Sequence, residues 1–236
     1  FSTMEDEYIR DQETNYIVNI IKNHKKNLNI LDIGCGNGYT LDQISKISKK
    51  NFLYGMDNNE SLFKIAHKRL YNKVRIIKSD IRNFNKNFKN KFDIVISQRV
   101  LINILNESDQ KKALKNIISY LKKSGKFIAI ESFNSGLKRL NNARVKFNIK
   151  KIKPKFHNKY LKDDFFKTKR LRKLDEENKN LSKHVFIARF LDEIYLKSKK
   201  TSKFTFNSKF VKYLDNTISE LNGNYSHLKL LLFKKR

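Results

Sequence analysis

The sequence predicts an α/β fold in which helices cover both faces of a doubly wound, mostly parallel sheet of seven strands. Short apolar runs alternate with stretches of helical periodicity, which is typical of strands joined by crossover helices. The first apolar run leads into a glycine-rich loop, and five successive predicted strands each end in a polar residue. Because ligands of such sheets bind at the carboxyl ends of the strands, we expect the site at that edge.

The alternation of helices and strands covers residues 4–133. A first helix over 4–26 carries acids at its start and lysines at its end, which suits the helix dipole. The predicted strands are 29–34, 51–57, 74–80, 91–98 and 126–133, and the predicted helices between them are 41–50, 60–72 and 108–125. Gly125 is expected to end the last of these helices.

A polar stretch over residues 134–165 interrupts the pattern and contains the only proline of the chain, Pro154. We interpret it as an insertion that caps the active site. A sixth strand over 168–178, a helix over 183–197 and a last strand over 226–235 follow. Residues 1–236 are therefore expected to form a single domain.

The chain has a formal net charge of +29, from 52 Lys and Arg against 23 Asp and Glu. Such a charge can indicate a nucleic-acid partner. However, Lys, Asn and Ile are abundant while Pro and Trp are scarce, as an AT-rich genome would produce, and the lysines are scattered. A nucleic-acid partner is therefore possible but not favoured, and nothing indicates an oligomeric state. No apolar run approaches the ~18–20 residues of a membrane span, and the single cysteine suits a cytoplasmic setting.

The glycine-rich loop reads Gly34-Cys35-Gly36-Asn-Gly38 and directly follows the strand that contains Asp32. This spacing differs from the G-x-G-x-x-G of dinucleotide-binding folds, and the Lys-Ser/Thr of a phosphate-binding loop is absent. An acid just before the loop would be badly placed beside a pyrophosphate but would suit a cationic ligand. S-adenosylmethionine is such a ligand, since it carries an ammonium and a sulfonium and no phosphate.

With LDIGCGNG and the polar strand ends, the chain resembles the class I S-adenosylmethionine-dependent methyltransferases, which have a Rossmann-like fold. The resemblance implies that Asp57, with Asn58 beside it, binds the ribose hydroxyls of the cofactor. It also implies that Asp80 and Ile81 bind the adenine, and that Gln98 lies where the methyl group is transferred.

In this family a helix before the first strand commonly covers the cofactor. Arg10 lies on the corresponding predicted helix and is expected to meet the methionine carboxylate of S-adenosylmethionine. The alternative is a solvated helix charge.

The methyl acceptor can be narrowed by what the sequence lacks. The stretch SQRV after the fourth strand has no (N/D)-P-P-(Y/F) motif, and Cys35 is not placed as a nucleophile, so neither adenine nor cytosine methylation is supported. No metal is predicted, since no Cys/His cluster has metal-ligand spacing. The favoured acceptor is a small polar metabolite, such as a sugar or sugar nucleotide, methylated on oxygen or nitrogen. The alternatives are an RNA methyltransferase and a catalytically silent module that binds S-adenosylmethionine.

Residues 131–160 resemble, more loosely, an E-x₄-GL-x-x-LN…HN-x-Y pattern of bacterial methyltransferases of small-molecule or surface-glycan biosynthesis. His157 is the candidate general base, because imidazole titrates near neutral pH, and Glu131 is the second catalytic candidate. The alternatives are a structural histidine and a loop anchor. The candidate substrate-binding residues are Arg99, Arg139, Arg144, Asn158 and Tyr160.

Overall fold

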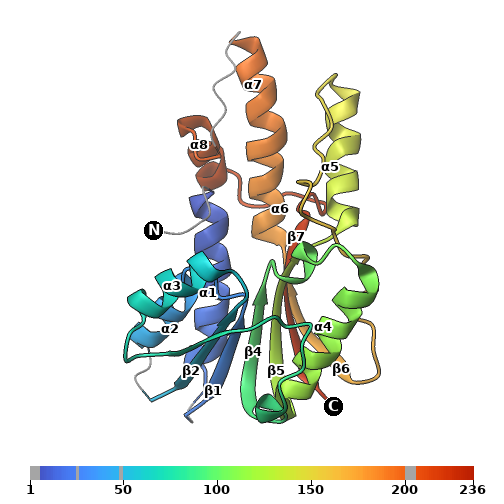
Figure 1. The fold of residues 1–236 in the computed structure, drawn as a ribbon. Coiled ribbons are helices and arrows are strands. Elements are labelled where there is room, and N and C mark those ends of the chain that lie inside the picture. The colour runs from blue at the N-terminus through green and yellow to red at the C-terminus, as the bar shows by residue number, and fades with distance from the viewer. Residues whose placement is uncertain (1–5, 25–26, 48–49, 200–205) are drawn as a thin grey trace.

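The computed structural model describes residues 6–24, 27–47, 50–199 and 206–236, and these residues form one seven-stranded sheet flanked by helices (Figure 1). The strand order is β3-β2-β1-β4-β5-β7-β6. The strands are β1 (Asn29–Ile33), β2 (Phe52–Asp57), β3 (Arg75–Lys78), β4 (Phe92–Gln98), β5 (Leu121–Ser132), β6 (Leu171–Glu177) and β7 (Leu228–Lys235). The first five are parallel, and β7 is antiparallel to both of its neighbours. The predicted fold class is confirmed.

Alternate residues of the central strands pack on opposite faces of the sheet, which is why each strand reads as a continuous apolar run. The helices are α1 (Glu7–Lys22), α2 (Tyr39–Ile47), α3 (Glu60–Arg69), α4 (Glu107–Tyr120), α5 (Asn134–Lys146), α6 (Lys179–Phe186), α7 (Asp192–Ser198) and α8 (Lys209–Thr217), with a π-helical turn, η3 (Ile187–Leu191), joining α6 to α7. Helices α1, α2, α3 and α6 share one apolar core with the sheet, and α4 packs in the core of the other face.

The helix predicted over 108–125 ends earlier than expected. It stops at Tyr120, and Leu121 begins β5 by pairing with Phe92 across a register shift. Leu121 is fully buried, so tertiary burial decides the boundary rather than the glycine signal. Gly125 lies within the strand, and the prediction that it ends the helix is wrong.

Residues 134–165 comprise α5 and a segment without regular structure that returns to the sheet. Backbone hydrogen bonds from Asn134 to Leu161 and from Leu161 to Ser132 tie both ends of the stretch to the carboxyl end of β5. In Figure 1, α5, α7 and α8 extend past the carboxyl ends of the parallel strands. The helices in the described part of the chain include none that is both long and apolar enough to span a membrane.

Candidate active site

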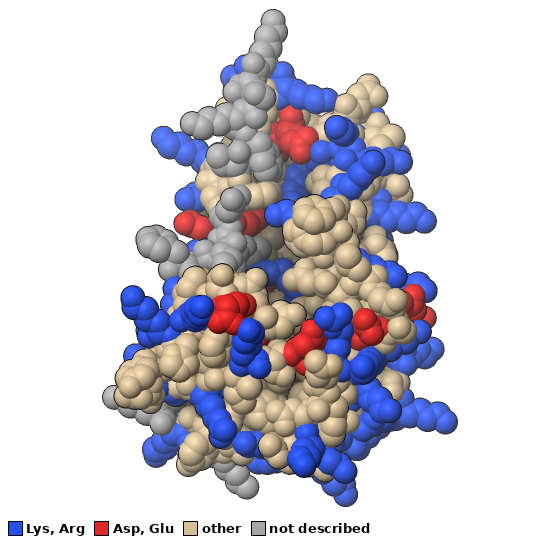
Figure 2. All heavy atoms as spheres, in the orientation of Figure 1, with Lys and Arg blue, Asp and Glu red and all other residues tan. Residues whose placement is uncertain are grey.

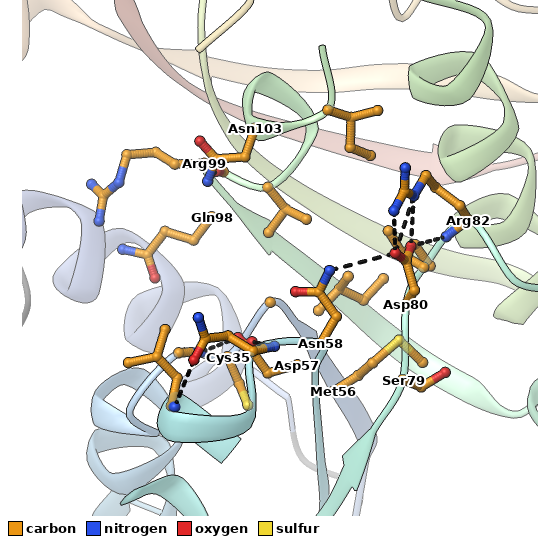
Figure 3. A pocket seen from close by; sticks show the side chains of 18 of the residues that line it. Cys35, Met56, Asp57, Asn58, Ser79, Asp80, Arg82, Gln98, Arg99 and Asn103 are labelled. Carbon is orange, nitrogen blue, oxygen red and sulfur yellow. Dashed lines mark hydrogen bonds and ion pairs between the residues drawn. The ribbon is translucent and has the colours of Figure 1, made fainter. Parts of the chain in front are cut away.

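A pocket with a volume of about 690 Å³ lies at the carboxyl ends of β1, β2, β3 and β4 (Figure 3). Its size is in the range of sites that hold a metabolite or cofactor. The turns that follow the four strands line it, together with residues of α1, α2 and α3, residues 103–106 and Asp109. The predicted site residues that line this pocket are Arg10, Gly34, Cys35, Gly36, Asp57, Asn58, Asp80, Ile81, Gln98 and Arg99.

The three glycines of the loop after β1 all have positive φ angles, between 57° and 78°. A Cβ on Gly34 would lie 2.5 Å from the Cγ2 of Val100, and one on Gly38 would lie 2.7 Å from the Cδ1 of Leu70. A Cβ on Gly36 would meet nothing within 4 Å. Gly34 and Gly38 are therefore needed for packing, whereas Gly36 faces open space that a ligand can enter.

The Asp57 carboxylate is held in place by backbone groups on either side of it. Its Oδ2 accepts a hydrogen bond from the Gly36 N–H and its Oδ1 accepts one from the Asn59 N–H, each at 2.8 Å. Asp57 is buried at the end of β2, and its side chain lines the pocket. Since each carboxylate oxygen has two lone pairs, both oxygens can accept a further donor from a ligand.

Asp80 is held by a residue that the sequence reasoning missed, Arg82 (Figure 3). The Arg82 guanidinium donates from Nε at 3.0 Å and from Nη2 at 2.6 Å, and its backbone N–H donates at 2.8 Å. This hydrogen bonding holds the pKa of Asp80 below its usual range. Asn58 donates to the same carboxylate at 3.4 Å, so the turns after β2 and β3 meet here. The pocket is also lined by apolar side chains, which suit an aromatic ring: Met56, Leu62, Ile81 and Ile104.

Asp32 lies beneath the glycine loop, and neither it nor Gly38 lines the pocket. Among the described residues its Oδ1 has no hydrogen-bond partner, although the atom is buried. Burial and the nearby charge of Asp57 raise the pKa of Asp32 to about 8. A positive charge close to the loop would stabilise the ionised form of Asp32.

Glu13 of α1 organises the end of β4, and it was not predicted as a site residue. Its fully buried carboxylate accepts hydrogen bonds from Nε2 of Gln98 and Nη1 of Arg99. Gln98 in turn accepts from the Thr40 hydroxyl at 2.9 Å. The signal was present, because Glu13 is four residues from Ile9 and from Ile17 on the buried face of the helix.

Arg99 adopts a backbone conformation that is uncommon for a residue other than glycine, with φ at 58°. Its N–H donates to Ile130 O at 2.7 Å, which fixes the sharp turn after β4 against β5. Backbone strain of this kind clusters at ligand sites. The turn directs the Arg99 side chain toward α1 and the pocket.

Glu131 is fully buried and faces the turn after β4, not the pocket. Its Oε1 accepts from the Ser97 hydroxyl at 2.7 Å and from the N–H groups of Val100 and Leu101 at 3.1 Å, and its Oε2 accepts from the Ile102 N–H at 3.3 Å. Burial raises the pKa of Glu131 to about 7. This placement matches the alternative interpretation, a loop anchor.

The structure does not bring three other candidates to the pocket. His157 is exposed, with its ring against Phe156 at 5.0 Å, and so it is not placed to act as a base there. Arg139 donates to Asn224 O at 3.4 Å, and Arg144 is buried in an ion pair with Glu193 at 2.7 Å. The pattern in the sequence could not distinguish these side chains from ones that face a ligand.

The remaining two candidates lie in the segment that returns to the end of β5. The Tyr160 ring stacks on His227, with the ring centroids 5.4 Å apart, and Asn158 is two residues away along the chain. The Phe133 N–H donates to His227 O at 2.6 Å, and the Arg99 N–H donates to Ile130 O, so His227 and the Arg99 turn both lie at the carboxyl end of β5. His227 was not predicted as a site residue.

Comparison with known proteins yields one family match and several relatives. A family model described as a methyltransferase domain matches residues 24–185. Carboxy-S-adenosyl-L-methionine synthase of Staphylococcus epidermidis is 32% identical over 127 residues, which are 52% of this chain and 54% of that protein. The ubiquinone/menaquinone biosynthesis C-methyltransferase UbiE of Wigglesworthia glossinidia brevipalpis is 34% identical over 107 residues, 43% and 42% of the two chains. The chain thus spans about half the length of these curated relatives.

Among solved structures, the N-methyltransferase NodS of Bradyrhizobium japonicum WM9 superposes with a TM-score of 0.59 at 12% sequence identity, covering 98% of each chain. The same protein in complex with S-adenosyl-L-homocysteine gives a TM-score of 0.56. At this level of identity the likeness shows the fold.

Proposed function

The chain belongs to the methyltransferase domain family, which confirms the predicted family and its cofactor, S-adenosylmethionine; we propose that it methylates an oxygen or nitrogen of a small polar metabolite. One observation carries this proposal. The pocket contains a glycine loop and carboxylates that suit the cofactor. It also contains the polar side chains of Gln98 and Arg99, at the end of β4, to which an acceptor can bind.

The residues of the pocket fit S-adenosylmethionine. The space above Gly36 admits the cofactor close to the backbone, and the fixed Asp57 carboxylate suits two ribose hydroxyls. Asp80 suits the adenine amine, and the apolar side chains that line the pocket suit the ring. Asp32 does not line the pocket, but its buried Oδ1, which has no hydrogen-bond partner among the described residues, suits a positive charge near the glycine loop.

The same residues disfavour a phosphate ligand. Asp57 and Asp80 would place two carboxylates beside it, and like charges at short range repel. S-adenosylmethionine supplies an electrophilic methyl group. The residues of the chain therefore have to orient the acceptor, exclude water and receive a proton where one is released.

The charge on one face of the molecule supports a small acceptor over RNA. Lys and Arg are spread over the whole face drawn in Figure 2, with Asp and Glu among them, and they do not gather in one basic band. We also propose that residues 134–165 cap the acceptor side of a single domain, since both ends of this stretch are tied to the end of β5.

A labelling experiment tests the proposed function. The full chain is incubated with methyl-labelled S-adenosylmethionine and a crude cell extract, and the labelled product is fractionated and identified by mass. We expect label in the small-molecule fraction, much less with Asp57→Ala, and no change with Asp164→Ala, which alters an exposed acid outside the pocket. Label in RNA would overturn the acceptor class. Cofactor binding without transfer to any fraction would favour the silent module.

A further inference from the structure

Four polar residues from distant parts of the sequence lie near the carboxyl end of β5. The Phe133 N–H donates to His227 O, Nδ2 of Asn134 donates to Tyr160 O, and the charge of Arg189 acts on His227. Asn158 and Tyr160 come from the segment after α5, Arg189 from η3, and His227 from the residue before β7; we call them the inner polar cluster. Figure 1 shows the start of β7 between α6 and the base of α5. The Tyr160 and His227 rings are stacked within 5° of parallel.

Three atoms of the inner polar cluster are buried without a hydrogen-bond partner among the described residues. They are Oδ1 of Asn158, Nε of Arg189 and Nδ1 of His227. Buried polar atoms in native proteins are nearly always paired with protein, water or a ligand. Here three separate segments of the chain each contribute one buried polar atom without a hydrogen-bond partner among the described residues.

Arg189 carries a positive charge that no carboxylate neutralises by an ion pair in the described part of the chain. Its neighbour Arg144 is paired with Glu193, and Arg99 is paired with Glu13. The acid that acts most strongly on Arg189 is Asp6, whose oxygens already accept from the Ile9 N–H and face His184. The guanidinium carbon of Arg189 lies 4.6 Å from the centroid of the Phe206 ring.

His227 is neutral in this environment. Burial, with the positive charges of Arg189 and Arg99, lowers its pKa to about 3. A neutral imidazole has one nitrogen that accepts a hydrogen bond. The inner polar cluster thus offers a guanidinium for an anion and, next to it, an acceptor for a hydroxyl or amine.

We propose that the inner polar cluster is the acceptor site and that the methyl acceptor is an anion whose carboxylate or phosphate binds Arg189. The guanidinium fork matches both groups, because two parallel N–H donors meet two oxygens. His227 then accepts from the polar group to be methylated, which lies toward Arg99 and the cofactor pocket. This inference rests on the proposed function and adds the charge of the substrate.

Anion binding to the chain saturated with S-adenosylhomocysteine tests the inference. Inorganic phosphate and acetate are titrated separately at constant ionic strength, and binding is followed by the rise in Tm. Arg189→Gln is compared with the wild type and with the matched control Arg172→Gln, an exposed arginine of β6. We expect wild type and control to bind one of the anions equally, and Arg189→Gln to bind at least tenfold more weakly.

The anion that binds more tightly, phosphate or acetate, identifies the anionic group that the acceptor carries. Equal binding by Arg189→Gln and wild type would overturn the inference, and so would saturation with S-adenosylhomocysteine without any effect of either anion. Failure to bind S-adenosylhomocysteine would instead contradict the proposed function. The two failures are therefore distinguishable.

A second measurement needs no variant of Arg189. The imidazole resonances of His227, assigned with His227→Gln, are followed by NMR against pH with and without the anion. An anion on Arg189 offsets the positive field, so the pKa of His227 should rise. Resonances that neither anion moves would contradict the inference even if Arg189→Gln fails to fold.

Discussion

The carboxylate of Glu13, in the middle of α1, is bonded to the guanidinium of Arg99 at the end of β4. The two residues are 86 positions apart in sequence, and Glu13 is fully buried. Gln98 donates to the other oxygen of the same carboxylate. One helix before the first strand therefore holds the turn after β4 that lines the pocket.

Glu13→Ala is expected to lower the free energy of unfolding by about 3 kcal/mol, because removing one partner of a buried pair leaves the other uncompensated. This loss is at the low end of the roughly 3–5 kcal/mol expected for breaking a buried ion pair, since the Arg99 side chain is 31% exposed. Chemical denaturation measures it, with the exposed Glu7→Gln on the same helix as the control. A loss no larger than that of the control would mean that the pair contributes nothing to stability.

Glu13 also illustrates how much of the site a sequence reveals. The glycine loop and the strand ends were predictable, because a local motif and a regular alternation place them at one edge of a sheet. The position of Glu13 on the apolar face of its helix, between Ile9 and Ile17, also indicates from the sequence that this carboxylate is buried. Arg189 and His227 carry no local signal, since only the tertiary fold brings η3 beside β7. His157 fits a motif yet faces solvent, because motif and orientation are independent.

Asp57→Ala should weaken the binding of S-adenosylhomocysteine by tenfold or more. Each charge-assisted hydrogen bond contributes about 1.5–3 kcal/mol, and the substitution removes the acceptor for two ribose hydroxyls. Calorimetry on the folded variant measures the affinity, and Asp164→Ala serves as the control at an exposed acid. An unchanged dissociation constant would remove Asp57 from the cofactor site.

Asp80→Ala should weaken S-adenosylmethionine and S-adenosylhomocysteine by the same factor, on the order of tenfold. The two ligands share the adenine, and they differ at the sulfur. Arg82→Gln, which removes the guanidinium hydrogen bonds to the Asp80 carboxylate, should weaken the binding of both ligands by a smaller factor. If Asp80→Ala affects only one ligand, Asp80 lies near the sulfur and does not bind the base.

Stability should fall as the pH rises above about 6.5 because of His184. This buried imidazole lies 2.5 Å from Asp215 Oδ2 and 3.2 Å from Asp6 Oδ1. Burial alone would lower the pKa of His184, but the hydrogen bonds to Asp215 and Asp6 raise it above 6.5. The contribution is therefore complete below the unfolded-state pKa and is lost as pH rises through the folded-state pKa. Each unit by which the folded-state pKa exceeds the unfolded-state pKa contributes about 1.4 kcal/mol to the free energy of unfolding.

Urea denaturation at a series of pH values measures this dependence. His184→Gln should be less stable at pH 6 and should lack the decline above it. The exposed His67→Gln should keep the wild-type profile. A profile of His184→Gln that parallels the wild type would assign the decline to other groups.

The two histidines near the acceptor side should differ in their effect on turnover. His157 is exposed, and nothing in its surroundings directs it to the pocket, so His157→Gln should change kcat/KM by no more than about twofold, since it loses no transition-state contact. His227 has a buried Nδ1 with no hydrogen-bond partner among the described residues, so His227→Gln should lower kcat/KM. A loss of roughly tenfold, confined to KM, corresponds to one hydrogen bond to the bound acceptor. A loss of about 10²–10⁴ in kcat would mean that His227 also receives the proton. The assay uses the acceptor found by labelling, and the opposite ranking of the two variants would return the role of base to His157.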